Sequence, residues 1–271
     1  TFTKNGNTAG VNSITDDLIT ITLNAGQTFV LEAQLTDPNV LPRANHRGWL
    51  GATISSDKKI AVNQGHMGLS VTTGSQDMSM TQITPTSNIG KQYAFIRGNG
   101  ADIAEFPIII ATENDTKVYV NNDKSTPYAT LNNGEWVQIP SSKYSQSGSQ
   151  SPGANMYVEA SKNVYAFQTI DVTYATSGTF TMDVFQVAPL NCLLDNGVNK
   201  IPSIIKTGRT NSDLSSISVM IMASSAINAS DIAINYGTGS VNRIASDILT
   251  NARKPISGTN DWVTYNVNIL A

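Results

Sequence analysis

Cysteine is almost absent from this sequence, whose 271 residues include a single one, Cys192. One thiol cannot form an internal disulfide, so core packing must hold the fold together. Histidine is nearly as scarce: His46 and His66 are the only two, and they lie 20 residues apart. Without a closely spaced pair of His or Cys ligands, the sequence carries no zinc-site pattern.

Charge is also low. Charged residues make up 14% of the chain and the formal net charge is −3, whereas soluble domains average about 25% charged residues. The densest basic groups are the pairs Lys58-Lys59 and Arg253-Lys254. A phosphate backbone is bound by an extended basic surface, which this chain lacks. We therefore predict that it does not bind nucleic acid.

Long apolar runs are missing as well, and none approaches the roughly 20 residues of a membrane-spanning helix. The sequence opens at Thr1-Phe2-Thr3 without a charged, apolar leader and ends in a strand-like run at Ala271. We interpret it as a mature or excised segment of a longer exported protein, with neighbouring domains of the same chain among its partners. No membrane span is predicted in this segment.

Signatures of catalysis are absent too. A nucleophilic triad needs Ser or Cys beside a His that a carboxylate orients, and no Gly-X-Ser-X-Gly elbow occurs. His46 and His66 are predicted in exposed loops, and Cys192 as a buried, inert thiol. The Gly98-Asn99-Gly100 segment lacks the third glycine of a phosphate loop. We predict no enzyme, with no catalytic, cofactor-binding or metal-binding residues; the ligand-binding residues are not identified by the sequence.

Calcium is the one metal for which an alternative stays open. It prefers oxygen ligands, and clusters of Asn and Asp occur in predicted turns, although none has the EF-hand spacing. The residues that could supply such oxygens are Asn114, Asp115, Asn121, Asn122, Asp123, Asp16, Asp17 and Asp37. Ordinary turns stabilised by Asn and Asp side chains also explain them, so a structural calcium ion is the weaker alternative.

The chain does contain many short apolar or alternating runs bounded by Gly, Asn, Asp and Pro, which indicate β-strands. The predicted strands are residues 18–23, 28–35, 60–62, 93–96, 106–111, 117–120, 136–139, 156–159, 164–168, 179–187, 217–223, 231–234 and 262–269. Only residues 244–254 have a weak helical pattern, with Ile244, Ile248 and Leu249 on one face. The pattern predicts an all-β, mostly antiparallel fold.

Parts of the sequence repeat. Residues 59–64 (KIAVNQ) and 82–85 (QITP) align with 163–168 (NVYAFQ) and 186–189 (QVAP), both at an offset of 104. With small insertions, 108–111 aligns with 220–223, 117–121 with 231–235, and Trp136-Val137 with Trp262-Val263. Because the order is preserved, we predict two tandem duplicated β-sandwich units, residues 1–128 and 129–271, which could share strands. Trp136 and Trp262 would then each pack in the core of their own unit.

Aromatic residues beside loops are the candidate contact surface. Trp49, Tyr128 and Tyr144 flank predicted loops and could form a platform for a glycan or a protein. Residues 141–152 (SSKYSQSGSQSP) form the longest low-complexity stretch. We predict that it is a flexible loop joining strands, with a contact loop as the weaker alternative.

Several motifs resemble those of a known family. Residues 51–62 (GATISSDKKIAV), 84–93 and 113–118 (ENDTKV) look like the N-terminal domain of IgG Fc-binding proteins. Residues 155–159 (NMYVE), 164–168 (VYAFQ) and 187–192 (VAPLNC) resemble the same domain in large flavobacterial cell-surface proteins. The similarity runs from about Gly26 to Trp262. It implies a β-rich extracellular module of a long secreted or surface protein, associated with adhesion and gliding, and brings no catalytic residues.

Together these features predict a non-catalytic, extracellular or cell-surface module of a bacterial protein that acts in adhesion or ligand presentation. Its partners would be a protein or glycan at a surface. The alternative is a structural assembly component, such as a filament, surface-layer or virion part, that binds its own copies or neighbouring subunits.

Overall fold

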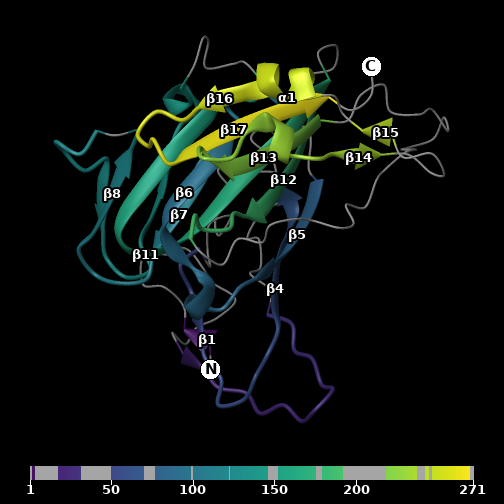
Figure 1. Ribbon diagram of the computed structural model, residues 1–271. Coiled ribbons are helices and arrows are strands. Elements are labelled where there is room, and N and C mark those ends of the chain that lie inside the picture. Colours follow the sequence, from purple (N-terminus) through teal and green to yellow (C-terminus); the bar gives the residue numbers. More distant parts are fainter. Residues whose placement is uncertain are drawn as a thin grey trace.

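Antiparallel strands dominate the structure, as the sequence predicted (Figure 1). A computed structural model of the chain describes residues 2–3, 18–31, 50–69, 77–98, 100–121, 123–145, 152–174, 179–191, 218–236, 242–243 and 246–268. The helical elements in these ranges are short: α1 (Ser246–Ala252) and the 3-10 turns η1 (Thr86–Asn88), η2 (Ser141–Lys143) and η3 (Ala229–Asp231). The all-β expectation is confirmed.

The largest sheet has seven strands in the order β10-β7-β11-β8-β9, and β6 and β12 also pair with β11. Its strands are β6 (Gly90–Ile96), β7 (Pro107–Ala111), β8 (Thr116–Val120), β9 (Ala129–Leu131), β10 (Trp136–Gln138), β11 (Asn155–Tyr174) and β12 (Thr179–Gln186). Three of these, β6, β7 and β8, precede residue 121 and pair with β11 from the later part of the chain.

Strand β11 organises this sheet. It runs for 20 residues, and a register shift between Glu159 and Val164 divides it into two halves. The first half pairs with β6 and β8, and the second with β7 and β12. The sequence predicted two separate strands here, at 156–159 and 164–168, which is wrong. The polar residues between them form a bulge-like irregularity that bends the strand without ending it.

The remaining strands form small sheets. A three-stranded sheet has the order β13-β17-β16, another the order β2-β1-β3, and two hairpins are β4–β5 and β14–β15. The bounds are β1 (Phe2–Thr3), β2 (Leu18–Ile19), β3 (Thr53–Ile54), β4 (Val62–Leu69), β5 (Asp77–Ile83), β13 (Ser218–Ser224), β14 (Asn235–Tyr236), β15 (Asn242–Arg243), β16 (Arg253–Pro255) and β17 (Trp262–Asn268).

Several of the predicted strands differ in the structure: only 18–19 of residues 18–23, and only Val62 of residues 60–62, belong to a strand. Residues 28–31 have no strand pairing, and residues 232–234 follow η3 without joining a sheet. The predicted helix is confirmed at α1, but Ile248 and Leu249 do not share its buried face. Leu249 is 1% exposed in the core and Ile248 is 46% exposed.

The main core lies on one face of the large sheet. The alternating pattern of β7 and β8 buries every second residue, as in Ile109 and Val118, which are both fully buried. These side chains pack with Tyr93, Phe95 and Val158 in one continuous cluster. The alternation that predicted these strands therefore also fixes which side chains form the core.

A second contact places the β13-β17-β16 sheet over the large sheet (Figure 1). Ala94, Tyr157 and Ile256 form a small apolar cluster between the sheets, against which Met222 and Trp262 pack. The fully buried Asn155 on β11 joins them: its Nδ2 donates to Pro255 O at 2.9 Å and to Thr264 Oγ1 at 2.8 Å. The two layers are thus held by both apolar packing and a polar tie.

The predicted boundary after residue 128 falls inside the β8–β9 hairpin. Val118 pairs with Ala129 across it, and β11 takes partners from before and after it. Strands from the two sides of this boundary share one sheet, which the prediction of shared strands allows. The division into units 1–128 and 129–271 stays a prediction.

Tyr93 makes the core sensitive to alkaline pH. It is fully buried, its hydroxyl donates to Val164 O at 2.6 Å, and it accepts from Gly90 N at 2.9 Å. Burial raises the pKa of Tyr93 from 10.0 to about 12. A folded pKa above the unfolded one means that the neutral form is stabilised in the fold, an effect complete below pH 10 and lost as the pH rises through 12.

We expect the free energy of unfolding to fall by roughly 2 kcal/mol between about pH 10 and pH 12 through this group. Tyr93→Phe should cost about 1–2 kcal/mol at pH 8, through the lost hydrogen bonds, and should flatten that alkaline decline. Urea titrations at pH 8, 10, 11 and 12 measure both effects. If the variant and the original chain lose equal stability over this range, Tyr93 is not the group responsible.

Candidate functional site

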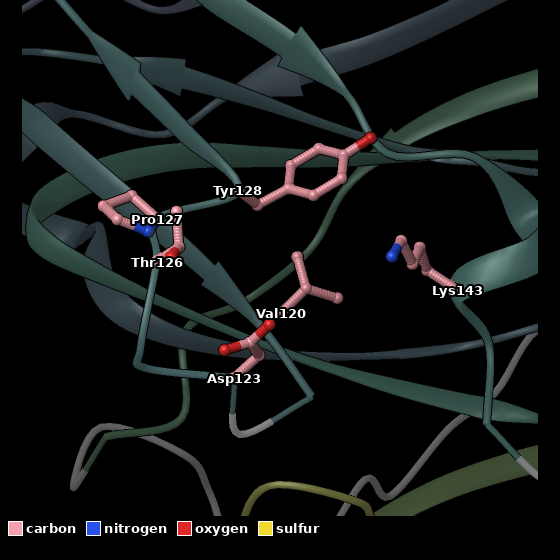
Figure 2. A pocket seen from close by; sticks show the side chains of 6 residues that line it. All are labelled: Val120, Asp123, Thr126, Pro127, Tyr128 and Lys143. Carbon is pink, nitrogen blue, oxygen red and sulfur yellow. The ribbon is translucent and has the colours of Figure 1, made fainter.

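A small pocket lies at the turn of the β8–β9 hairpin (Figure 2). It is lined by Val120, Asp123, Thr126, Pro127, Tyr128 and Lys143. Its volume is about 200 Å³, whereas pockets for drug-sized ligands are about 300–1,000 Å³. The space therefore suits one side chain or a group of similar size.

Local hydrogen bonds fix the hairpin turn. Asn121, with φ of 51°, takes the left-handed conformation that asparagine tolerates. Its side-chain amide donates to Lys143 O, and its Oδ1 accepts from Tyr157 N at 3.1 Å. Tyr128 N donates to Val118 O at 2.7 Å, which closes the hairpin. Asn121 thereby holds the end of η2 beside the turn and brings Lys143 to the pocket.

The pocket combines an aromatic ring with charges of both signs. The Lys143 ammonium lies 5.8 Å from the centroid of the Tyr128 ring, within reach of a cation–π interaction. Opposite them, Asp123 Oδ1 accepts from the Ser125 hydroxyl and from Ser125 N. These hydrogen bonds hold the pKa of Asp123 below its usual range. The pocket therefore presents an ionised acceptor, a cation and a partly exposed ring, a combination suited to binding.

Of the three aromatic residues that the sequence singled out, only Tyr128 is found at a surface site. It is 38% exposed and lines the pocket. Tyr144 is 4% exposed and packs in the main core, so its predicted exposure is wrong. It follows η2 directly, and that turn directs it inward; burial raises its pKa. Trp49 lies outside the described residues.

Asp123 and Lys143 were not predicted as parts of a binding site. From the sequence, Asp123 is a candidate calcium ligand, and Lys143 belongs to the loop predicted at residues 141–152. The sequence did contain a signal for the pocket, because the oppositely charged Asp123 and Lys143 lie in turn-forming segments on either side of Tyr128. What the sequence lacked was the contact between Asn121 and Lys143, which joins segments 22 residues apart.

The other residues weighed for chemistry are dispersed or outside the described ranges. His66 lies on β4 opposite Ser79, so its predicted place in an exposed loop is wrong. His46, Cys192, Asp16, Asp17, Asp37 and Asn122 lie outside the described ranges. The part of the chain that the structure describes contains no group of three or more His, Cys, Asp or Glu side chains arranged for a metal ion. Asn114 Oδ1 accepts from Asn133 N at 3.0 Å, as a turn residue. A structural calcium ion stays an untested prediction.

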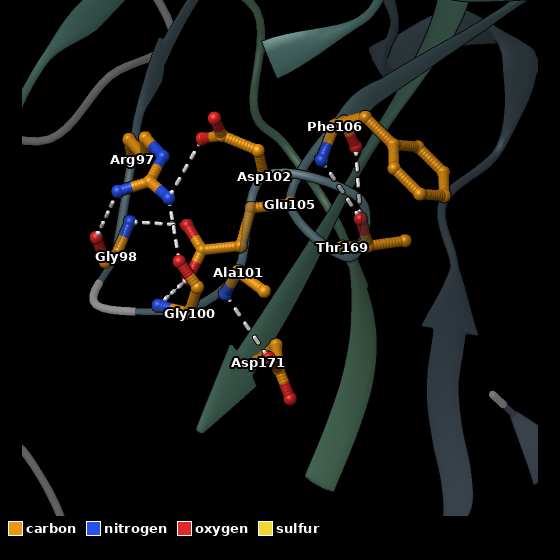
Figure 3. A network of polar contacts seen from close by, with 9 residues as sticks. All are labelled: Arg97, Gly98, Gly100, Ala101, Asp102, Glu105, Phe106, Thr169 and Asp171. Atoms are coloured by element: carbon orange, nitrogen blue, oxygen red, sulfur yellow. Dashed lines mark hydrogen bonds and ion pairs between the residues drawn. The ribbon is translucent and has the colours of Figure 1, made fainter. Parts of the chain in front are cut away.

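A second polar cluster lies in the loop after β6 (Figure 3). The fully buried Glu105 accepts from Gly98 N at 2.6 Å and from Gly100 N at 2.5 Å. Arg97, 2% exposed, donates to Gly100 O and to Asp102 Oδ1, the latter at 3.0 Å. Burial raises the pKa of Glu105, and the two glycine N–H groups and Arg97 act against it.

This cluster is tied to β11. Thr169 Oγ1 accepts from Phe106 N at 2.9 Å, and Asp171 Oδ2 accepts from Ala101 N at 3.2 Å. Because Glu105 is fully buried, it is closed to a ligand. The cluster holds residues 97–98 and 100–106 against the large sheet. The pocket beside Tyr128 is the better candidate for binding.

Comparison with known protein families identifies the family of this chain. The family model described as IgGFc binding protein matches residues 1–268. The chain belongs to this family. The match confirms the resemblance found in the sequence motifs and extends over both predicted units. Searches of curated proteins and of solved structures each returned no match.

Membership in the IgGFc binding protein family indicates a binding function for this chain. The family is one of binding domains, typically extracellular, and is not known as a catalytic one. This member is accordingly a protein-binding module with a β-rich fold. None of the helices in the described ranges has the length and apolar character needed to cross a membrane.

Proposed function

We propose that this IgGFc-binding domain is a non-catalytic adhesion or ligand-presenting module of a bacterial cell-surface or secreted protein. Its pocket would receive one anchoring side chain of a protein partner. The observation that carries the proposal is the partly exposed Tyr128 ring, which lines one pocket with Asp123 and Lys143 on a hairpin of the large sheet. Glycans at a surface and neighbouring domains of the same chain are the further partners proposed.

The chemistry of the pocket limits what fits. Tyrosine on a fixed turn offers a large contact area and loses little conformational entropy on binding, which is why it is frequent at binding hot spots. Asp123 offers a carboxylate acceptor, and its pKa, held low by Ser125, keeps it ionised. A side chain with an apolar or flat body and a hydrogen-bond donor at its tip would use both groups.

Replacing Tyr128 tests this function. A panel of immobilised proteins, including IgG Fc, and a glycan array are screened with the full chain, and the dissociation constant is measured for whatever binds. Tyr128→Ala should weaken binding about tenfold or more, as expected when a hot-spot aromatic is removed. Tyr128→Phe, which keeps the ring, should weaken it much less.

Tyr119→Ala is the matched control, because Tyr119 is a partly exposed tyrosine on the neighbouring strand β8 and does not line the pocket. If Tyr128→Ala and Tyr119→Ala bind the partner as tightly as the original chain, the pocket is not the binding site. If no protein or glycan is retained, the adhesion proposal fails as a whole.

The alternative function is an assembly role in which copies of the chain bind one another. It is favoured by one specific observation: β4 and β13 each pair along one edge only within the described residues.

A further inference from the structure

Two hairpins of this chain pair in the same register. In β4–β5, Asn63 lies opposite Gln82 and Gly65 opposite Met80. In β11–β12, Phe167 lies opposite Gln186 and Thr169 opposite Val184. Each residue of the second set is 104 positions after its counterpart, the same offset at which the two sequence blocks align. The two hairpins are therefore structural counterparts, residue by residue.

The counterpart hairpins lie side by side, with β5 along the outer edge of β12. Ser79 Oγ donates to Asp183 Oδ1 at 2.6 Å and accepts from Val184 N at 3.1 Å. Asp77 Oδ2 accepts from Met182 N at 3.0 Å. Side chains of β5 thus satisfy the outward N–H groups of β12 in place of a regular strand ladder. The junction covers β12 and leaves the far edge of the β4–β5 hairpin, which is β4, as the end of the array.

The two hairpins differ at that far edge. Strand β7 pairs with β11 there, placing Ile110 opposite Tyr165 and Ile108 opposite Phe167. Thr169 N continues the pairing by donating to Phe106 O at 3.1 Å. In β4, a Cβ built on Gly65 would lie only 4.0 Å from Met80 Cβ, the close spacing of a non-hydrogen-bonded pair, so Gly65 and Asn63 direct their backbone groups away from β5. In the described part of the chain β4 pairs only with β5, so none of the described strands takes the place beside β4 that β7 has beside β11.

The counterpart of β7 is β13. Each pairs with a strand that begins at a tryptophan: Trp136 lies opposite Ile110, and Trp262 opposite Ser224. The hydrogen bonds beside these pairs also match, since Ala111 N donates to Glu135 O and Ser225 N to Asp261 O. In this register Ile110 corresponds to Ser224, whereas the alignment of 108–111 with 220–223 makes it correspond to Met222, two residues earlier.

The edge of β13 that faces away from β17 presents its backbone groups in the arrangement that pairing with β4 requires. Successive residues of a strand direct their N–H and C=O groups to alternate sides. Because Ser225 bonds towards β17, the even-numbered residues Met222 and Ser224 direct these groups away from β17. Their counterparts in β7, Ile108 and Ile110, direct the same groups towards β11. Among the described strands, β13 pairs only with β17. Among the described strands, β13 therefore corresponds to β7, the strand that is added, and β4 to β11, the strand to which it is added.

We propose that β13 of one copy of this chain pairs antiparallel with β4 of a second copy. The pairing would rebuild, across two molecules, the order β10-β7-β11-β12 of the large sheet as β17-β13-β4-β5. Strand addition at the edge of a sheet supplies main-chain hydrogen bonds without a specialised pocket. Since donor and acceptor are different surfaces, the contact is head-to-tail, and copies would associate in open rows. This surface is separate from the Tyr128 pocket.

The register gives a direct test by disulfide formation. Ile109 lies opposite Ala166 between β7 and β11, and the corresponding residues of the proposed contact are Ala223 and Val62. The backbone groups of Val62 and Ala223 bond to β5 and β17 of their own chains, so the two residues would form a non-hydrogen-bonded pair. Such pairs have Cα atoms about 4.5 Å apart, which is within the range of a disulfide. The variants Val62→Cys and Ala223→Cys are made separately in a Cys192→Ser background.

Mixing the two single-cysteine variants under oxidising conditions should give a covalent dimer that contains one chain of each kind. The matched control mixes Val62→Cys with Met222→Cys, whose side chain lies on the opposite face of β13, and should give about tenfold less dimer. Equal yields in the two mixtures would overturn the proposal. So would a double variant, Val62→Cys with Ala223→Cys, that closes its disulfide within a single chain.

A second measurement does not require cysteine. Sedimentation velocity of the original chain should show a mass that increases with concentration. Asn63→Pro removes an outward N–H at an edge position where proline is tolerated, and should weaken association about tenfold through lost strand pairing. Asn63→Thr, which keeps the N–H, should associate as the original does. A chain that stays monomeric at every concentration, or equal association of both variants, would refute the pairing.

Discussion

Replacing Glu105 with alanine is expected to lower the free energy of unfolding by about 3–5 kcal/mol, the largest effect of any single change considered for this chain. The side chain is fully buried and accepts from Gly98 N and Gly100 N. Alanine would leave both donors without their acceptor and open a cavity beside Arg97. Because Arg97 keeps its ion pair with Asp102 at 3.0 Å, the loss arises from the two N–H groups and the packing.

Urea unfolding followed by circular dichroism measures this loss, and Glu105→Gln is the informative control. Glutamine fills the same space and keeps one oxygen acceptor, so it should cost less, about 1–3 kcal/mol. The exposed Glu113, on the loop after β7, provides a second control: its ion pair with Lys162 is 3.9 Å long and lies at the surface. Surface pairs of this kind contribute under about 1 kcal/mol. A Glu105→Ala chain as stable as Glu113→Ala would contradict the assigned role.

The second large effect is expected from Asn155→Ala, which should cost about 2–4 kcal/mol and loosen the small sheet from the large one. The Asn155 amide donates to Pro255 O and Thr264 Oγ1, which belong to β16 and β17. The substitution removes the polar tie between layers and leaves the Thr264 hydroxyl, 1% exposed, without this donor. Apolar packing of Tyr157 against Trp262 would remain.

Hydrogen exchange followed by mass spectrometry distinguishes a local from a global loss. We expect protection to fall mostly in β16 and β17, with β7 and β8 nearly unchanged, because the main core does not depend on this residue. Asn132→Ala, at an exposed asparagine between β9 and β10, should change neither stability nor protection. Uniform loss across both sheets would show that the layers unfold as one unit and that Asn155 is not a local tie.

The parts of the fold that the sequence predicted are those in which local pattern and burial agree. The alternation in residues 107–111 and 116–120 gave two strands that bury alternate side chains. Strand β5 was missed because its sequence places Met78 and Met80 on the exposed face, 79% and 76% exposed, while Ser79 is buried. That inversion follows from the contact of Ser79 with β12, a partner about a hundred residues away in the chain.

The candidate site divides in the same way. Tyr128 was predicted from its place beside a turn, whereas Lys143 and Asp123 join it only because Asn121 bonds to the end of η2. Tyr144 has the same local context as an exposed aromatic, yet it is buried. Tyr144 directly follows η2, which directs it into the core, whereas Tyr128 ends the loop of the β8–β9 hairpin at the surface, and composition carries no information about that difference.

The sequence by itself determined the all-β class, the family, the absence of a catalytic signature and the blocks that repeat at an offset of 104. These depend on residue type and local alternation, which act over a few positions. The tertiary structure decided that β11 is one bent strand shared by partners from both sides of residue 128, that β5 covers β12, and that one pocket forms beside Tyr128. Such features arise from pairing and packing between distant segments, whose free energy depends on the whole sheet and is not encoded in any one stretch of the chain.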